Sequence, residues 1–350
     1  MFLSSEILFP SITMERNFPK NFTPVDAPLF EPSRLGQAWE IKLKRYADLT
    51  ANNEIFLKQR FFIMMESFGD EWQSKKYNTL RYATKSFLKD RLRRNVYVDE
   101  AVWCLDTFST GGYFHWITEI LPRLWMAEQH LDREIAFPLP SYFLSKWKFG
   151  SDLLKPFGRK TLVFEESDLL KIKRVNIITQ PGGPLNYQPT PLTKSVQKVK
   201  EFYYDSAYST TIEKIYISRQ KTGRRVVLNE PEVTRLLEHY GYRTLHLEDL
   251  SIYDQVNLFS RAKEVVSIHG AGLTNMAFME RGKVIEIRQR KASQMLNFFF
   301  TLAHTFQHDY YYCFDLLNGQ QVAESRKNPR FESASIHADT KMLKEILDSF

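Results

Sequence analysis

The clearest hydrophobic pattern in the chain lies between residues 214 and 287, where short apolar runs alternate with amphipathic stretches. The apolar runs have the length and β-branched composition of buried strands, and the stretches between them repeat apolar residues with helical spacing. Capping residues precede two of these stretches, and glycines mark places where the pattern changes. The pattern predicts strands at 214–218, 242–247, 265–268 and 283–287, connected by helices.

This alternation is typical of a mostly parallel sheet with helices on both faces, which binds ligands beyond the carboxyl ends of its strands. Arg219 follows the first predicted strand, Glu248 the second and His269 the third, and Glu286 lies within the fourth. We therefore expect these side chains to gather at one edge of the sheet. Further candidates follow the first strand: Lys221, Arg224, Arg225 and Asn229.

The third predicted strand runs into a glycine turn that opens a helix. Glycine lets the backbone approach phosphate oxygens, and unpaired amides at a helix start point toward an anion. A Gly-x-Gly pair also occurs for purely steric reasons. Together with the cations, and with Glu286 as an acceptor for ribose hydroxyls, the turn predicts a nucleoside diphosphate site. Its candidate residues are His269, Gly270, Ala271, Gly272, Leu273 and Asn275.

A second block of interest, residues 113–130, has the apolar spacing of a helix that begins after Gly112. His115 and Glu119 lie four residues apart, so a helix places both on one face. A carboxylate could orient the imidazole and raise its basicity, or act as a base itself. Such a pair fits proton removal from an alcohol, although a packed histidine would show the same spacing. Arg123, one turn further on, is a weaker candidate.

Both blocks resemble glycosyltransferase family 61. The likeness is strong over about 215–287 and extends to an upstream His-Trp block at 113–124. One departure is visible, since many members have an Asn before the aromatic pair where this chain has Gly111-Gly112. The downstream residues that carry the resemblance are Ile217-Ser218-Arg219, Arg225, Asn229-Glu230, Gln255, Ala262, His269-Gly270-Ala271-Gly272-Leu273-Thr274-Asn275, Phe278 and Val284-Ile285-Glu286.

The resemblance implies a bacterial-type member with an α/β, GT-B-like fold of two Rossmann-type α/β/α domains facing a central cleft. It implies inverting transfer of a sugar from a nucleotide sugar, with UDP favoured, to a hydroxyl of a glycan or lipid-linked glycan. A role in surface polysaccharide, such as capsule, or in glycoconjugate synthesis follows from it. The chain has no Asp-x-Asp motif, so we expect no metal and no cofactor.

The residues receive the following expected roles. His115 or Glu119 is the general base and the other orients it, a choice that the spacing leaves open. Arg219, Arg225 and the amides of residues 269–272 stabilise the departing nucleotide, and Glu286 holds the ribose. Leu273 and Asn275 complete the donor-binding set.

The length of 350 residues predicts two domains. We expect an acceptor-side α/β domain at 1–195, whose residues 1–40 form an irregular arm rich in Pro and Phe. A Rossmann-like domain that binds the nucleotide sugar is expected at 205–330. A helix within 331–350 is expected to cross back to the amino-terminal domain, as terminal helices do in GT-B enzymes.

A formal net charge of +7 suggests an anionic partner, but the cations are spread along the chain and no nucleic-acid motif is present. We therefore expect no nucleic acid partner. The segment 142–160 mixes aromatic residues with cations, which is typical of peripheral membrane contact and also of a helix whose aromatics face the core, the interpretation that we favour. No signal peptide is apparent, so we expect a cytoplasmic protein, with or without contact at the inner face of the membrane. Cys104 and Cys313 show no metal spacing and are expected to be buried free thiols.

Two alternatives belong to other classes. A dinucleotide-dependent, sugar-modifying oxidoreductase or epimerase would also have a glycine turn, but this turn lacks the third glycine of the usual motif. A non-catalytic module that binds a sugar nucleotide or a glycan would use the same binding residues and would leave His115 and Glu119 without a role.

Overall fold

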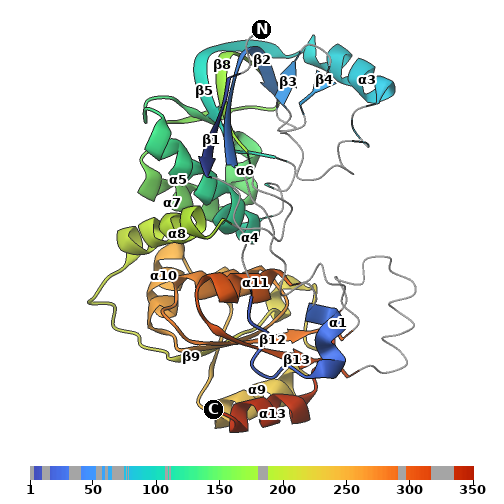
Figure 1. Ribbon diagram of the computed structural model, residues 1–350, viewed down its shortest axis with the longest axis vertical. Coiled ribbons are helices and arrows are strands. Elements are labelled where there is room, and N and C mark those ends of the chain that lie inside the picture. Colours follow the sequence, from blue (N-terminus) through green and yellow to red (C-terminus); the bar gives the residue numbers. More distant parts are fainter. Residues whose placement is uncertain are drawn as a thin grey trace. The chain divides into compact units, whose positions relative to one another are not determined.

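The computed structural model describes residues 4–9, 16–30, 41–52, 57–59, 62–64, 75, 77, 79–106, 109, 112–179, 188–290, 297–316 and 335–350 (Figure 1). The chain forms two compact units. Unit 1 consists of Met1–Thr13 and Gln37–Val199, and unit 2 consists of Met14–Gly36 and Lys200–Phe350.

Unit 2 is built on a five-stranded sheet in which every pair of neighbours is parallel. Four of its strands confirm the sequence prediction, and the fifth, β13, follows them. The strand order is β10-β9-β11-β12-β13, so the chain starts inside the sheet and reverses direction once. The strands are β9 (Lys214–Ile217), β10 (Arg243–Leu245), β11 (Glu264–Ile268), β12 (Lys283–Arg288) and β13 (Asp309–Phe314).

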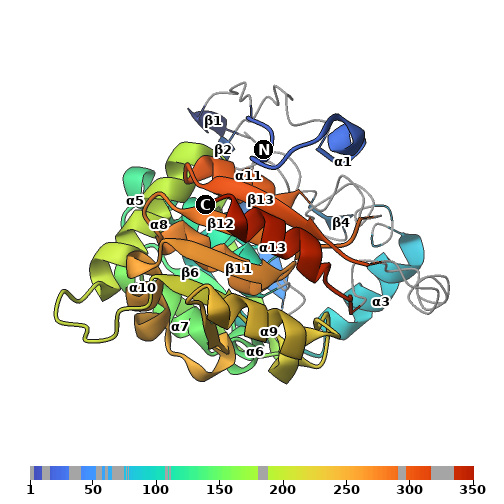
Figure 2. The same ribbon diagram turned by 90° about the horizontal axis from the view of Figure 1, so that it is seen from below.

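Helices cover both faces of this sheet (Figures 1 and 2). On one face, α9 (Glu230–His239) and α13 (Thr340–Asp348) pack together over apolar residues of the central strands. On the other face lie α10 (Ile252–Arg261), η8 (Ala271–Phe278) and α11 (Phe298–Thr305). Two short 3-10 turns, η6 (Gln220–Thr222) and η7 (Leu247–Asp249), follow β9 and β10. The arrangement is a doubly wound α/β layer structure.

The strand order reverses between β9 and β11, the position at which open parallel sheets form a crevice at the strand ends. In open parallel sheets, ligands bind where neighbouring strands send their connections to opposite faces. β9 leads to α9 on one face, whereas β11 leads to η8 on the other. The segments after these two strands contain Arg219 and Gly270, so the topology brings the predicted cation and the predicted glycine turn to the same crevice. The helix after the turn is 3-10 rather than α.

The described part of unit 1 holds a mixed sheet, so the expectation of two Rossmann-type domains in a GT-B-like arrangement stays a prediction. Its larger sheet has the order β4-β3-β2-β8-β5, and β1 also pairs with β2. Among the described strand pairs of this sheet, β5 and β8 are parallel and the others are antiparallel. A parallel bridge from Ala101 to Ala136 leads from β5 toward the parallel pair of β6 and β7. The strands are β1 (Ser4–Phe9), β2 (Ile41–Asn52), β3 (Leu57–Gln59), β4 (Phe62–Ile63), β5 (Arg94–Trp103), β6 (Phe137–Pro140), β7 (Thr161–Phe164) and β8 (Asp168–Ile178).

The helices of unit 1 include a continuous segment with a π-helical centre, formed by α4 (Tyr113–His115), η4 (Trp116–Ile120) and α5 (Leu121–His130). All five η4 residues are buried. The last helix of the unit, α8, reaches into unit 2, and the glycine- and proline-rich stretch 180–184 before it lies outside the described residues. The other helices are α3 (Leu80–Asp90), α6 (Ser141–Lys146), α7 (Phe149–Leu154), η5 (Lys155–Phe157) and α8 (Pro189–Tyr203).

Residues 1–40 are not a single irregular arm. Strand β1 pairs with β2 in unit 1, whereas η1 (Pro24–Asp26) and α1 (Ala27–Phe30) belong to unit 2. The amide of Lys20 donates to the carbonyl of Tyr310 at 2.8 Å, and the side chain of Asn21 bonds to the backbone of Tyr312. The segment therefore covers the edge of β13, which would otherwise present unpaired backbone groups.

The carboxyl-terminal helix packs on its own unit. Leu343, Ile346 and Leu347 of α13 contact Val233 and Leu237 of α9 in one buried cluster. The expected return of this helix to the amino-terminal domain stays a prediction. The helix is amphipathic, and its apolar face is buried against the sheet and α9.

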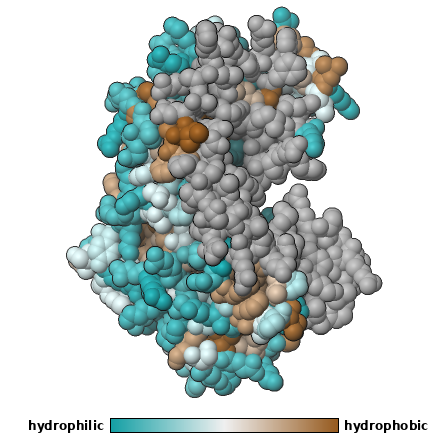
Figure 3. Space-filling model, in the orientation of Figure 1, coloured by the Kyte–Doolittle hydropathy of each residue, from teal (hydrophilic) through white to brown (hydrophobic). Residues whose placement is uncertain are grey.

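No helix in the described part of the chain is long and apolar enough to cross a bilayer. On the face shown in Figure 3, hydrophilic residues cover most of the described surface and hydrophobic residues occur in small groups.

Both cysteines are buried free thiols, as the sequence predicts. Burial raises the pKa of Cys104 to about 12 and that of Cys313 further. Because the thiolate is the reactive form, we expect neither thiol to react with iodoacetamide in the native protein at pH 8 and both to react after unfolding in urea. Mass spectrometry of the alkylated protein measures this. Rapid native labelling of either cysteine would contradict the burial described.

His308 is a buried structural histidine, and its surroundings predict that the folded protein loses stability in acid. Its Nε2 donates to the carbonyl of Met276 (2.9 Å) and its Nδ1 accepts from the amide of Gly282 (3.2 Å), which requires the neutral ring. Burial lowers the pKa of His308 to about 4. The unfolded chain, with an ordinary histidine pKa near 6.5, therefore binds a proton first as the pH falls, and stability is lost between pH 6.5 and 4.

We expect this single group to remove about 2 kcal/mol of unfolding free energy between pH 7 and pH 5, at roughly 1.4 kcal/mol per pKa unit. In His308→Gln the absolute stability should be lower, but the fall between these two pH values should be smaller by that amount. Urea unfolding of both proteins at the two pH values measures it, and parallel pH dependences would show that His308 does not titrate as described.

Candidate functional site

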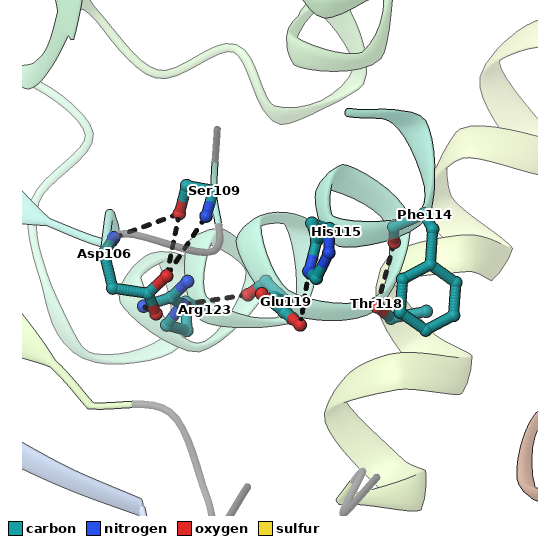
Figure 4. A network of polar contacts seen from close by, with 7 residues as sticks. All are labelled: Asp106, Ser109, Phe114, His115, Thr118, Glu119 and Arg123. Carbon is teal, nitrogen blue, oxygen red and sulfur yellow. Dashed lines mark hydrogen bonds and ion pairs between the residues drawn. The ribbon is translucent and has the colours of Figure 1, made fainter. Parts of the chain in front are cut away.

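The unit 1 candidates, His115 and Glu119, form a directly bonded pair (Figure 4). His115 Nδ1 lies 2.7 Å from Glu119 Oε1. Glu119 lies in the π-helical turn, a rare helix form that often marks functional sites. The segment begins at Gly112, whose φ of 103° favours glycine and whose missing side chain leaves room for the ring of Trp147. Gly111, its partner in the departure from the family pattern, lies outside the described residues.

Burial separates the roles of the two residues. The Glu119 side chain is 0% exposed, whereas the His115 side chain is 21% exposed. Nδ1 of His115 faces Glu119, so the buried carboxylate can orient the imidazole, and His115 is the more exposed member of the pair.

A second buried ion pair holds this helix. Arg123 donates through Nε to the carbonyl of Glu119 (2.9 Å) and through Nη1 to Asp106 Oδ2 (3.0 Å), and both charged side chains are 3% exposed. Asp106 also accepts from the amide of Ser109. Arg123 is therefore a structural partner of the pair and not a surface cation. Asp106 is a site residue that the sequence analysis missed, because nothing in its local pattern distinguishes it.

The pair tunes the basicity of His115. Burial by itself lowers the pKa of His115, but the charge and hydrogen bond of Glu119, together with the charge of Asp106, outweigh burial and raise it above the ordinary value. A neutral His115 with a raised pKa is a stronger base than a free imidazole. This suits removal of a proton from a hydroxyl.

In unit 2, Arg219 lies against the glycine turn. A side chain on Gly270 would meet Nη1 of Arg219 at 2.6 Å and its Cδ at 3.1 Å. The φ of Gly270 is 173°, an extended conformation open to any residue, so glycine is required here for space and not for backbone freedom. The structure thus brings together the predicted cation and the predicted turn.

Other cations lie close to Arg219. Burial, followed by repulsion from Arg225, lowers the pKa of Arg219 to about 10, so the guanidinium is still charged at neutral pH. Its Nε is buried without a hydrogen-bond partner among the described residues. Arg225 has a φ of 52°, which is uncommon for a residue with a side chain and is often found at functional sites. Crowded cations with an unsatisfied donor favour a bound anion.

The turn supplies amides but not every predicted side chain. Among the described residues, the amides of Gly270, Ala271 and Gly272 have no backbone partner, whereas that of Leu273 donates to the carbonyl of Gly270 at 3.0 Å. The Leu273 side chain is buried in the core. Asn275 is fully buried, and its Nδ2 donates to Gln255 Oε1 (3.0 Å). Both side chains are therefore buried behind the turn, and their donor-binding roles stay predictions.

Glu286 cannot hold a ribose in this structure. Its side chain is 0% exposed, and its two oxygens are engaged by His269 Nδ1 and by the hydroxyl of Tyr310. Burial favours the neutral form, but His269, Arg288 and the tyrosine outweigh it and hold the pKa of Glu286 below its usual value. Glu286 is therefore a charged carboxylate that orients His269. The sequence analysis missed Tyr310, which lies on the neighbouring strand.

The four remaining unit 2 candidates divide into two groups. Glu248 and Arg224 are exposed and lie close enough to Arg219 to affect its charge, and Lys221 pairs with Asp249. Asn229, in contrast, is buried and bonds to both backbone groups of Ala338, so it joins α9 to the carboxyl-terminal segment. The side chains of Glu248, Arg224 and Lys221 are therefore accessible to a ligand, whereas that of Asn229 is not.

The segment 142–160 serves the core of unit 1. Phe143 and Phe157 are buried, and Phe149 packs edge-on against Trp116, with ring centroids 5.9 Å apart. The structure therefore supports the interpretation of this segment as helices whose aromatics face the core. Within the described residues, no group of three or more His, Cys, Asp or Glu side chains is placed to hold a metal ion.

Residues 113–285 match the model of a family described as Glycosyltransferase 61. The chain is 24% identical over 222 residues to xylan glycosyltransferase MUCI21 of Arabidopsis thaliana, which covers 51% of this chain and 42% of the relative. It is 24% identical over 225 residues to protein O-linked-mannose beta-1,4-N-acetylglucosaminyltransferase 2 of Danio rerio, covering 54% and 37%. The chain thus spans about two fifths of the length of these curated relatives. The family match and the two relatives show that this chain is similar to the glycosyltransferases of family 61.

Proposed function

We propose that this protein transfers a sugar, with inversion, from a UDP-sugar to a hydroxyl of a glycan acceptor. The observation that carries the proposal is the contact between Arg219 and the Gly270 turn at the strand-order reversal of unit 2, which suits a nucleoside diphosphate. The preference for UDP and a GT-B-like arrangement of two domains follow from the resemblance to the family. The acceptor class agrees with the glycan and glycoprotein named for the two relatives.

His115 supplies the base in this proposal. Its Nε2 takes the proton of the acceptor hydroxyl while the oxygen attacks the anomeric carbon from the face opposite the leaving group. The bond between that carbon and the phosphate oxygen breaks, and the nucleoside diphosphate leaves with the electron pair. Glu119 holds the ring through Nδ1 and stabilises the imidazolium that forms.

The leaving group is stabilised by Arg219, Arg225 and the amides of the glycine turn. Arg224 and Glu248 lie close enough to Arg219 to contribute to this field. A guanidinium fork and oriented amides can neutralise a diphosphate without a divalent ion. We therefore propose metal-independent transfer, and we expect turnover to persist in EDTA. Activity that collapses in EDTA and returns with manganese would contradict this.

The test of the proposed function is a donor screen followed by a turnover assay. Thermal unfolding with UDP-, GDP- and CMP-sugars and with NAD should show a shift for a UDP-sugar, and slow release of UDP should then be detectable. Stabilisation by NAD alone would favour the oxidoreductase alternative. Stabilisation by a UDP-sugar without any hydrolysis or transfer to glycans would favour a non-catalytic binding module.

The cellular setting stays a prediction. We propose synthesis of surface polysaccharide or glycoconjugate in the cytosol, with the acceptor free or lipid-linked. Flotation with anionic liposomes at low salt tests membrane contact, and the burial of Phe143 and Phe157 argues for little binding through the segment 142–160.

A further inference from the structure

Helix α3 of unit 1 exposes large apolar side chains to solvent. None of its eleven residues is buried. Leu80 is 85% exposed, Leu88 is 58% exposed, and Leu92, in the turn after the helix, is 90% exposed. Phe87 is exposed as well, and it shares one helix face with Leu80 and Leu88 because residues seven or eight apart lie on the same side. Figure 3 shows hydrophobic residues at the surface where Figure 1 places α3. Large apolar side chains that gather on an exposed face are typical of an interaction surface.

The other side of α3 holds the helix on unit 1. Lys58 of β3 bonds to Asp90 Oδ2 at 2.8 Å, and its side chain is buried. Arg93, just after the helix, is equally buried, and its Nη1 lies 3.6 Å from Asp90 Oδ1. Tyr82 packs beside Ile63. Because these contacts fix the inner side of the helix, the leucines stay on its exposed side.

Cations border the exposed face of α3. Residues 80–94 contain six lysines and arginines against one aspartate, and two of the six cations pair with acidic residues elsewhere in unit 1. Arg81, Lys85 and Arg91 are exposed and form no ion pair with the residues that the structure describes. The guanidinium of Arg91 lies 5.2 Å from the centroid of the Phe87 ring, so it borders the apolar side chains directly. The outer face therefore combines apolar side chains with positive charge that has no counterpart nearby.

An anionic lipid surface fits this combination. Leucine side chains can enter the boundary between headgroups and acyl chains, while the long stems of arginine and lysine let their charges reach lipid phosphates. A second copy of the chain docked through the same face would bring two positively charged helices together, which their charges oppose. The segment 142–160 has a similar composition but buries Phe143 and Phe157, so it offers no such face.

We propose that α3 is a peripheral membrane-binding helix. Leu80, Leu88 and Leu92 enter the surface of an anionic bilayer, and Arg81 and Lys85 bind the lipid phosphates. This surface shares no residue with the nucleotide site of unit 2 or with the His115 pair. Its failure and the failure of the proposed function are therefore distinguishable.

Both kinds of side chain contribute to the expected affinity. Each lysine or arginine close to an anionic membrane strengthens binding by about fivefold, and each leucine removed from water strengthens it by about tenfold. Because salt screens the ionic part, binding should weaken strongly near about 1 M NaCl, where the Debye length is about 3 Å. Vesicles without charged lipid should bind the protein weakly at any salt concentration.

The experiment is flotation of the full chain at low salt with vesicles of phosphatidylcholine, with and without phosphatidylglycerol. The wild type should float with the anionic vesicles and remain at the bottom with the neutral ones. The double variant Arg81→Gln/Lys85→Gln should lower the partition coefficient by about 25-fold, and Leu88→Gln should lower it by about tenfold. The three side chains are exposed, so urea unfolding should show little change in stability.

Two matched controls make the same chemical changes in unit 2. Arg235→Gln/Lys341→Gln removes an exposed arginine and an exposed lysine, and Leu228→Gln replaces a leucine that is 53% exposed. Both controls should float as the wild type does.

Four outcomes would overturn the inference. They are no flotation with anionic vesicles, equal flotation with neutral ones, equal losses in the α3 variants and the controls, and a dimer in light scattering that Leu88→Gln abolishes without any vesicle binding. The last outcome would assign the face to contact between copies of the chain.

Discussion

Replacing His115 by alanine is expected to lower kcat/KM by about 100-fold to 10,000-fold, the range typical for loss of a general base. The affinity for UDP should not change, because the donor groups lie in unit 2. The His115 side chain is partly exposed, so the fold should tolerate its removal. Steady-state kinetics and UDP titration of the same preparation measure both quantities.

The Glu119→Gln variant tests whether Glu119 orients His115 or removes the proton itself. The charge of Glu119 helps to raise the pKa of His115, so the wild-type rate should climb as the pH rises through a value above the ordinary histidine range. Without that charge, burial lowers the pKa, and the acid limb should move to lower pH. The plateau should also fall, because an amide holds the imidazole less firmly in the required tautomer.

The matched control is His130→Ala, since His130 is exposed at the end of α5 in the same continuous helical segment. It should keep wild-type turnover and the wild-type pH profile. Near-normal turnover in both His115→Ala and Glu119→Gln would show that neither is the base. An acid limb that does not move in Glu119→Gln would show that the limb belongs to another group.

The sequence predicted unit 2 well because buried parallel strands appear as continuous apolar runs between capped helices. The exception is β13, which begins with Asp309 and three tyrosines. Two of these side chains bury their rings while their hydroxyls bond to carboxylates: Tyr310 bonds to Glu286 and Tyr312 to Asp26. A strand of this kind has no continuous apolar run, so its pattern did not stand out.

Unit 1 was predicted less well because its contacts are mostly distant along the chain. Strand β2 pairs with β8, which lies more than a hundred residues further along the chain. Lysine and arginine residues interrupt the apolar residues in the sequence of β2. Residues 16–30 join unit 2 through bonds to β13. Local periodicity cannot show such pairings, since the partner strand decides which face is buried.

At the site, spacing predicted which residues meet but not which of them face a ligand. The four-residue spacing of His115 and Glu119 placed them in contact, as expected. The burial of Glu286 and Asn275 depends on neighbours in β13 and α10, so spacing could not predict it. Asp106 was missed for the same reason.

The second large effect is expected at Gly270. Gly270→Ala adds one methyl group where Arg219 now lies, and the clash of 2.6 Å involves the far end of a flexible side chain. The backbone is extended at this position, so alanine adds no strain there. The arginine must therefore move while the fold stays, and we expect the Kd for UDP to rise by about 10-fold to 100-fold, as for loss of a charge-assisted contact.

Arg219→Ala should weaken UDP binding by a similar factor, and the double variant should be little weaker than either single variant, because both changes remove one interaction. Arg219→Lys should recover only part of the affinity, since lysine keeps the charge but loses the planar fork. The control is Gly272→Ala, whose methyl group would meet Ile217 and Leu247 at 3.1 Å and not Arg219. If Gly270→Ala and Gly272→Ala weaken UDP binding equally, the turn matters only for its backbone shape, and Arg219 is not the group that receives the diphosphate.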